Sequence, residues 1–589
     1  MLATFDIHDH MLRHEVFLLV QESYAGSGVP TRKAVIKAIE KYRWSDQDDP
    51  DVEARTDRGK LEWYEMLHKA DPSCELASSR LADLKARNPE WTPREFPDLH
   101  HWHGPVESGG EPSPWAVEDL LSQSAEAWID RLLGHQGVSP FPGWERSGLL
   151  QAVLEASQRE PQWGLALAFE LDRRNVWQSD LWGALIGAWG TWTAEDTDVI
   201  ERIVDWLGRE EIRRHHQHRV ISALADLVRD GGKSCAAKVL QRTNAIAADL
   251  WPVSGEYDEE SPDDWLMRAL NRSPGMLASY WLRSLSVARR AEIVSKKGLP
   301  TEYLAAFEEM LCDNGMSGGY ARTFICSQFP FLLSIAKDWT LARVLPYFSS
   351  ASESEFQQAW QGFLAWSGLS PDVFEALSPA LLAAMEHRIG PFGGRRSRFV
   401  EYYGASAVVF AKDPLDLWIP TLFKVATPED RESFSRMVAH LLAGLDEARQ
   451  QEWWNRWIKR YWENRLSGRP ATLEPGELED MVGWLAHLEA VFPEAVALAC
   501  RSPVESLRRF PILYWLKDSP AIDRFPDDVV AFLTHLAKTA QASRFWEGEE
   551  SLFNRLGEKA IDPAKRQKLN EQLTILGLDS YVRAFNGSP

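Results

Sequence analysis

Apolar residues recur along most of the chain at the spacing of three and four residues that is typical of amphipathic helices. Ser-Pro and Thr-Pro pairs punctuate this pattern. Each pair is a helix start signal, because the hydroxyl caps a free N–H and proline tolerates the first turn. The pairs are Ser139-Pro140, Ser261-Pro262, Ser273-Pro274, Ser370-Pro371, Ser378-Pro379 and Thr427-Pro428. The pattern predicts an all-α fold, an irregular helical-repeat or α-solenoid-like array without a strict period.

Breaks in the pattern divide the chain into parts. Near the N-terminus the spacing predicts helices over about 11–24, 31–42 and 57–69. The acidic loop 255–264 and the Gly/Arg loop 390–398 are the expected seams further along. The predicted parts are a helical N-terminal unit (1–88), a Pro/Gly-rich linker (89–116), a helical array (117–390) and a Trp-rich C-terminal helical array (391–589).

The segment after Glu452 has the widest apolar face. On a helix its apolar positions cover about half the circumference, more than the stripe of about 100° on an ordinary surface helix. We therefore expect Trp457 and Tyr461, at the middle of the face, to be structural and to pack against the next helix. Trp453 and Trp462 lie at the edges of the face and are the expected partner-binding residues. The apolar positions are Trp453, Trp454, Trp457, Ile458, Tyr461 and Trp462, and the next helix carries Leu478, Met481 and Leu485.

Composition narrows the class of protein. The 589-residue chain has 27 tryptophans, most of which a helical array should bury, and five scattered cysteines without a C-x-x-C pair. Its net charge of −21 argues against broad binding to nucleic acid or to a membrane surface. The first residues lack a signal-peptide pattern, and no apolar run reaches the roughly 18 residues of a membrane helix. These features predict a cytoplasmic protein with no membrane partner.

Two groups of residues resemble the sequence of a known region of other proteins. They are Tyr461-Trp462, Arg465, Gly468, Pro470, Glu477, Met481, Trp484, Phe492-Pro493-Glu494 and Val496, and, upstream, His14-Glu15-Val16-Phe17, Asn88-Pro89, Trp102 and Ser113-Pro114-Trp115. With them the chain resembles the large helical C-terminal region of bacterial sirtuin-like and ATPase anti-phage defence proteins. That region is an uncharacterised domain without known catalytic residues. Fused family members carry an effector or nucleotide-binding module before it, whereas this chain is expected to be the helical part alone. The resemblance implies a role in anti-phage defence.

The sequence shows no nucleotide-binding loop. Gly231-Gly232-Lys233-Ser234 resembles the end of a phosphate-binding loop, but position 227 is leucine where that loop needs glycine. No G-x-G-x-x-G motif follows a predicted strand, so a dinucleotide site is not expected either. We therefore predict a protein that is not an enzyme and that has no cofactor.

Three histidine clusters raise a metal-dependent hydrolase as one alternative. Zinc needs three or four convergent ligands with supporting groups around them. His10 and His14 are four residues apart and can share a helix face, but they do not form an H-E-x-x-H motif. We therefore expect no metal site. The clusters are His8/His10/His14, His100/His101/His103 and His215/His216/His218.

Arg395, Arg396 and Arg398 form the densest basic loop. Arginines near aromatic side chains can hold phosphates or stack on bases, so a nucleic-acid-binding helical module is another alternative. The acidic chain favours ion pairs within the array instead. The three arginines remain candidate partner-binding residues, together with Trp453 and Trp462.

Taken with the resemblance, these features favour a non-catalytic sensor or scaffold component of a bacterial anti-phage defence system. A helical array presents an extended surface, which would recognise a phage protein or hold a separately encoded effector. An NAD-cleaving enzyme, a nuclease or an ATPase is the expected kind of effector.

Overall fold

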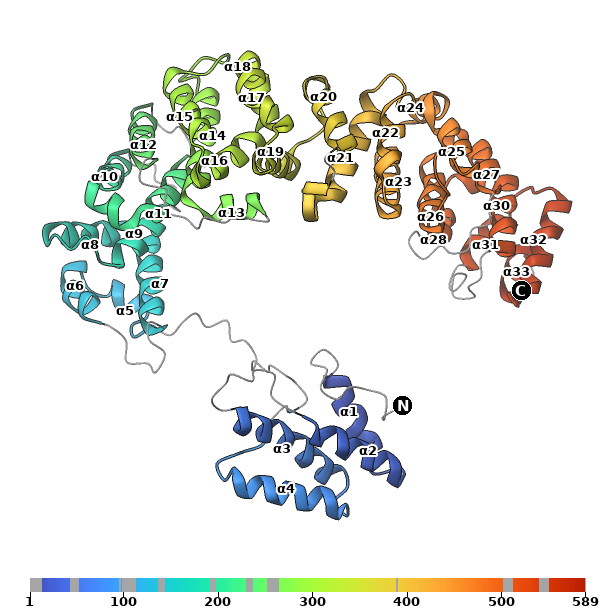
Figure 1. Cartoon of the computed structure of the whole chain (residues 1–589), viewed down its shortest axis with the longest axis horizontal. Coiled ribbons are helices and arrows are strands. Elements are labelled where there is room, and N and C mark those ends of the chain that lie inside the picture. The colour runs from blue at the N-terminus through green and yellow to red at the C-terminus, as the bar shows by residue number, and fades with distance from the viewer. Residues whose placement is uncertain are drawn as a thin grey trace. The chain divides into compact units, whose positions relative to one another are not determined.

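The structure is a computed structural model that describes residues 13–42, 52–94, 97, 113–135, 144–190, 197–228, 237–251, 264–387, 390–501, 512–539 and 550–587. Every regular element within these ranges is a helix, so the all-α prediction is confirmed (Figure 1). Two compact units divide the chain, Met1–Pro112 and Ser113–Pro589. Their boundary falls within the stretch predicted to be a linker, whereas the division expected at residue 390 lies inside the second unit.

The first unit has its own apolar core. Phe17 and Trp63 pack with their ring centroids 4.9 Å apart, and Arg32 pairs with Asp71 at 2.6 Å. The third helix begins at Val52, five residues earlier than expected. The helices of this unit are α1 (Arg13–Ser23), α2 (Val29–Glu40), α3 (Val52–Ala70) and α4 (Glu75–Arg87).

The second unit begins with helices of very unequal length. Its first part contains α5 (Val117–Leu121), α6 (Ala125–Gly134), α7 (Trp144–Arg159), α8 (Pro161–Arg173), α9 (Leu181–Trp189), α10 (Thr197–Leu207), α11 (Glu210–Leu227), α12 (Ala237–Leu250), α13 (Trp265–Asn271), α14 (Ser273–Arg290), α15 (Thr301–Cys312), α16 (Met316–Ser327), α17 (Phe329–Ile335), α18 (Lys337–Arg343), η1 (Leu345–Ser349) and α19 (Glu353–Trp366).

The second part continues to the C-terminal helix. It contains α20 (Pro371–His387), η2 (Gly390–Arg395), α21 (Arg396–Phe410), α22 (Trp418–Val425), α23 (Pro428–Leu442), α24 (Glu447–Trp453), η3 (Trp454–Ile458), α25 (Lys459–Leu466), α26 (Pro475–Gly483), η4 (Trp484–His487), η5 (Glu489–Val491), α27 (Phe492–Ala499), α28 (Ile512–Asp518), α29 (Ala521–Arg524), α30 (Pro526–Thr539), α31 (Glu550–Gly557), α32 (Pro563–Ile575) and α33 (Asp579–Asn586).

Helices of the second unit form two rows. In one row, which we call the inner row, α7 packs on α9, α9 on α11, α11 on α14, α14 on α16 and α16 on α19 (Figure 1). In the other row α6 packs on α8, α10 on α12 and α20 on α22. Helix α16 packs on α13 and α15 as well as on α14 and α19, so it needs a wide apolar face, and it is buried from Ser317 to Ser327.

Only some of the Ser-Pro and Thr-Pro pairs predicted to start a helix do so in the structure. Thr427 caps α23 by accepting a hydrogen bond from the Asp430 N–H at 3.3 Å, and α20 begins at Pro371. Ser378-Pro379 does not start a helix, because Pro379 lies inside α20 and the Ser378 hydroxyl donates back to the Phe374 carbonyl at 2.5 Å. Ser139-Pro140 and Ser261-Pro262 lie outside the described residues.

Among the described helices, none by itself has both the length and the apolar composition of a membrane span. One pair of segments, Pro475–His487 and Glu489–Ala499, reaches that composition only when the two are taken together, and they are bent by 94°.

Candidate functional site

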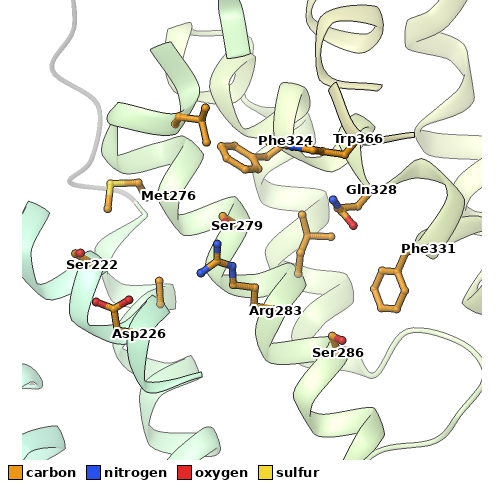
Figure 2. Close-up of a pocket in the computed structure, with 13 residues that line it drawn as sticks. Ser222, Asp226, Met276, Ser279, Arg283, Ser286, Phe324, Gln328, Phe331 and Trp366 are labelled. Carbon is orange, nitrogen blue, oxygen red and sulfur yellow. The ribbon is translucent and has the colours of Figure 1, made fainter. Parts of the chain in front are cut away.

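A groove of about 510 Å³ crosses the inner row of the second unit (Figure 2). Its volume lies within the roughly 300–1,000 Å³ of typical ligand sites. Helix α14 supplies the floor, α11 one wall, and α16, α17 and α19 the other. The lining residues are Ser222, Ala225, Asp226, Leu270, Met276, Ser279, Leu282, Arg283, Ser286, Phe324, Gln328, Phe331 and Trp366.

The floor is a face of α14 that carries three polar side chains, Ser279, Arg283 and Ser286. Met276, Ser279, Arg283 and Ser286 follow one another at spacings of three and four residues, which places them on one side of the helix. Serine is short, so the longer Arg283 side chain rises above its neighbours into the groove (Figure 2). Among the described residues no ion pair joins Arg283 to a carboxylate, and Asp226 on the α11 wall also lines the groove.

A buried polar network fixes the rotation of α14. The Tyr280 hydroxyl lies 2.8 Å from both Thr243 Oγ1 and Asn244 Oδ1. Ser284 donates to Asn244 Oδ1 at 2.7 Å, and the Asn244 amide donates to the Tyr303 hydroxyl at 3.1 Å. Buried polar groups need such partners, so the network holds one α14 face toward α12 and α15. A different face, which carries Arg283, is thereby turned to the groove.

Aromatic side chains form the wall opposite α11. Trp366 is 52 % exposed and stacks on Phe324, with ring centroids 6.1 Å apart and planes inclined by 30°. Phe331 is half-buried beside them (Figure 2). Exposed apolar surface also includes Leu270, at the groove, and Met267 one turn earlier on α13. Tryptophan and arginine are the residues most enriched at energetic centres of protein interfaces.

The position of Trp366 depends on a close helix crossing. A Cβ on Gly362 of α19 would lie 2.0 Å from the Thr323 carbonyl oxygen of α16, so only glycine fits between the two backbones. Trp366 follows Gly362 by one helical turn, and Phe324 follows Thr323. The crossing therefore brings the two aromatic rings together.

We expect Gly362→Ala to lower the free energy of unfolding by about 1–3 kcal/mol, because the added methyl group must push α19 away from α16. Urea denaturation measures this change. Gly183→Ala is the matched control, since a Cβ there meets no atom within 4 Å and alanine favours a helix by about 0.5–1 kcal/mol over glycine. Equal stability of the two variants would contradict the crossing.

The arginines predicted to bind a partner form ion pairs with carboxylates of the chain itself. Arg395 pairs with Asp264 at 3.2 Å, and Arg396 binds Asp430 through both its Nε and Nη2, at 3.0 and 2.5 Å. Exposed Arg398 lies 3.7 Å from Glu401. These residues do not form an open loop, because η2 runs to Arg395 and α21 begins at Arg396. Arg396 joins α21 to the cap of α23, which is a structural role.

The expectation that Trp453 and Trp462 lie at an accessible edge is wrong. Their exposed fractions are 6 % and 0 %. The helix contains a π-helical stretch, Trp454–Ile458, which rotates the residues after it relative to an ideal α-helix. Neighbours therefore cover almost the whole aromatic face. Trp457 and Tyr461 are buried as expected and pack against Trp484, with ring centroids 6.5 and 5.8 Å away.

The histidine clusters are only partly described. His216 of α11 hydrogen-bonds the Trp177 carbonyl oxygen at 2.8 Å, and burial lowers the pKa of His216. Exposed His14 lies at the start of α1. Within the described ranges, no group of three or more His, Cys, Asp or Glu side chains is arranged to hold a metal ion. His215 and His218 also lie in α11. Five positions of the clusters lie outside the described ranges, as do Gly231-Gly232-Lys233-Ser234; they are His8, His10, His100, His101 and His103.

The candidates predicted from the sequence include neither Arg283 nor Trp366, the two principal residues of the groove. The signal for the floor is the polar face of Ser279, Arg283 and Ser286 on a long helix whose other positions from Met276 to Ala288 are mostly apolar. Trp366 carries no such signal, because it continues the same spacing as the buried Trp360 and Phe363.

Comparison with known proteins reaches only the C-terminal part of the chain. No curated protein matches the chain. Residues 406–571 match a family described as a domain of unknown function (DUF4020). Every residue that lines the groove precedes this segment.

Proposed function

We propose that this chain is a cytoplasmic, non-catalytic sensor or scaffold of a bacterial anti-phage defence system, which recognises a phage protein or holds a separately encoded effector. The resemblance to the helical region of sirtuin-like and ATPase defence proteins supports the biological role. The groove supports the molecular role. The observation that carries the binding role is the exposure of Trp366 in a groove that also holds Arg283, which forms no ion pair with a described carboxylate.

A protein is the partner that this surface favours. The groove is open and aromatic, and exposed apolar side chains extend from it to Met267. Apolar patches of this kind mark protein contacts on soluble proteins. A nucleic acid would need several cations that are not already paired with carboxylates. In the predicted basic cluster, Arg395 forms an ion pair with Asp264 and Arg396 forms one with Asp430.

Trp366→Ala should remove a protein that co-purifies with the wild-type chain from phage-infected cells. An exposed aromatic anchor can contribute more than 2 kcal/mol to binding, or roughly thirtyfold in affinity, while truncation at an exposed site costs little stability. Quantitative mass spectrometry of the purified material measures the loss.

Tyr514→Ala is the matched control, because Tyr514 is 57 % exposed on α28, far along the chain from the groove. It should retain the partner. Loss of the partner in both variants, or in neither, would remove the groove from this proposal.

A further inference from the structure

We propose that the groove binds a protein segment that presents both a carboxylate and a bulky apolar side chain. The carboxylate pairs with Arg283, and the apolar side chain packs on Trp366. This inference rests on the proposed function, since it names the chemistry of the partner at the same groove.

Arg283 is the group that selects the carboxylate. Its neighbour on the same helix, Arg289, is buried and donates to the backbone carbonyls of Lys296 and Gly298. Arg343 binds Glu308 at 2.6 Å. Arg283 has no such partner among the described residues, and it is exposed on the floor of the groove. A guanidinium offers a planar pair of donors that matches a carboxylate, so its charge and geometry favour an acidic ligand.

Trp366 and Phe331 favour a ligand with a bulky apolar group. They stand on the wall away from α11, while the Arg283 guanidinium extends over the floor toward the side of Asp226 (Figure 2). A ligand that uses both must carry an acidic group on the α11 side of the groove and an apolar group on the α19 side. The hydroxyl groups of Ser279 and Ser286 flank Arg283 and can bind the ligand backbone. Exposed apolar side chains continue from Leu270, at the groove, to Met267, which fits a chain segment that extends beyond the groove.

A random peptide library displayed on a surface and panned against the full-length protein tests the inference. Bound peptides should be enriched in Asp or Glu together with Trp, Phe or Leu. A synthetic peptide from the selection should bind at least about tenfold more weakly to Arg283→Gln and to Trp366→Ala, because a charge-assisted pair and an aromatic anchor each contribute that much. Arg283→Glu should regain binding when the acidic residue of the peptide is replaced by lysine.

Arg202→Gln is the control, because Arg202 is an exposed arginine on α10, outside the groove. It should bind the peptide like the wild type. Selected peptides without acidic enrichment, no groove-dependent binder, or full binding to Arg283→Gln would each overturn the inference. If Trp366→Ala loses the cellular partner while Arg283→Gln keeps it, the scaffold proposal stands and the carboxylate inference falls. If neither variant loses it, both fall.

Discussion

Glu477→Ala should lower the free energy of unfolding by about 3–5 kcal/mol, because it leaves a buried guanidinium without its counter-charge. Arg465 and Glu477 are 1 % and 0 % exposed, and two hydrogen bonds of 2.6 and 2.8 Å join them. Arg431 also approaches Glu477, at 3.3 Å. Chemical denaturation followed by circular dichroism measures the loss.

The same pair anchors a loop. Arg465 donates to the backbone carbonyls of Arg469, Ala471 and Thr472, so it holds the connection from α25 to α26. Burial, together with the Glu477 carboxylate, raises the pKa of Tyr461, which keeps that phenol neutral beside the pair. The expected loss therefore includes the ordering of the loop.

An exposed ion pair provides the control. Arg524 and Glu447 are 2.7 Å apart but 41 % and 58 % exposed, so Glu447→Ala should cost no more than about 1 kcal/mol. The double variant Arg465→Met, Glu477→Leu should recover part of the loss, because it also removes the Arg465 guanidinium that Glu477→Ala leaves unpaired. Equal effects of Glu477→Ala and Glu447→Ala would show that the inner pair is hydrated.

Local chemistry explains how much of this fold the sequence can predict. Apolar spacing predicts the helices, and capping residues such as Thr427 predict where some begin. Burial on a given face depends on which neighbours pack there, and this is set by contacts between distant segments. Trp366 and Trp462 show the difference: both end an apolar helical pattern, yet the first is half exposed and the second is fully covered.

The electrostatic part of the site is harder to predict for the same reason. Arg283 and Arg396 are both arginines within helical, partly polar stretches. Arg396 meets Asp430 because the cap of α23 lies against the start of α21, and Arg283 meets no described carboxylate because its part of α14 faces the groove. Only the packing of helices separates a structural arginine from one available to a partner.

Trp462→Ala should lower the free energy of unfolding by about 3–5 kcal/mol, which is the usual cost of truncating a buried tryptophan and a large share of the roughly 5–15 kcal/mol of a typical domain. The Trp462 ring packs 6.4 Å from Trp454 and 5.6 Å from Trp484, so its loss leaves a cavity between α25 and η4. Trp366→Ala removes an identical side chain from a half-exposed position and should cost no more than about 1 kcal/mol. Parallel thermal melts and urea titrations of the two variants compare these costs. If Trp462→Ala unfolds like the wild type, the aromatic face of α25 is not covered, and Trp462 returns as a candidate for partner contact.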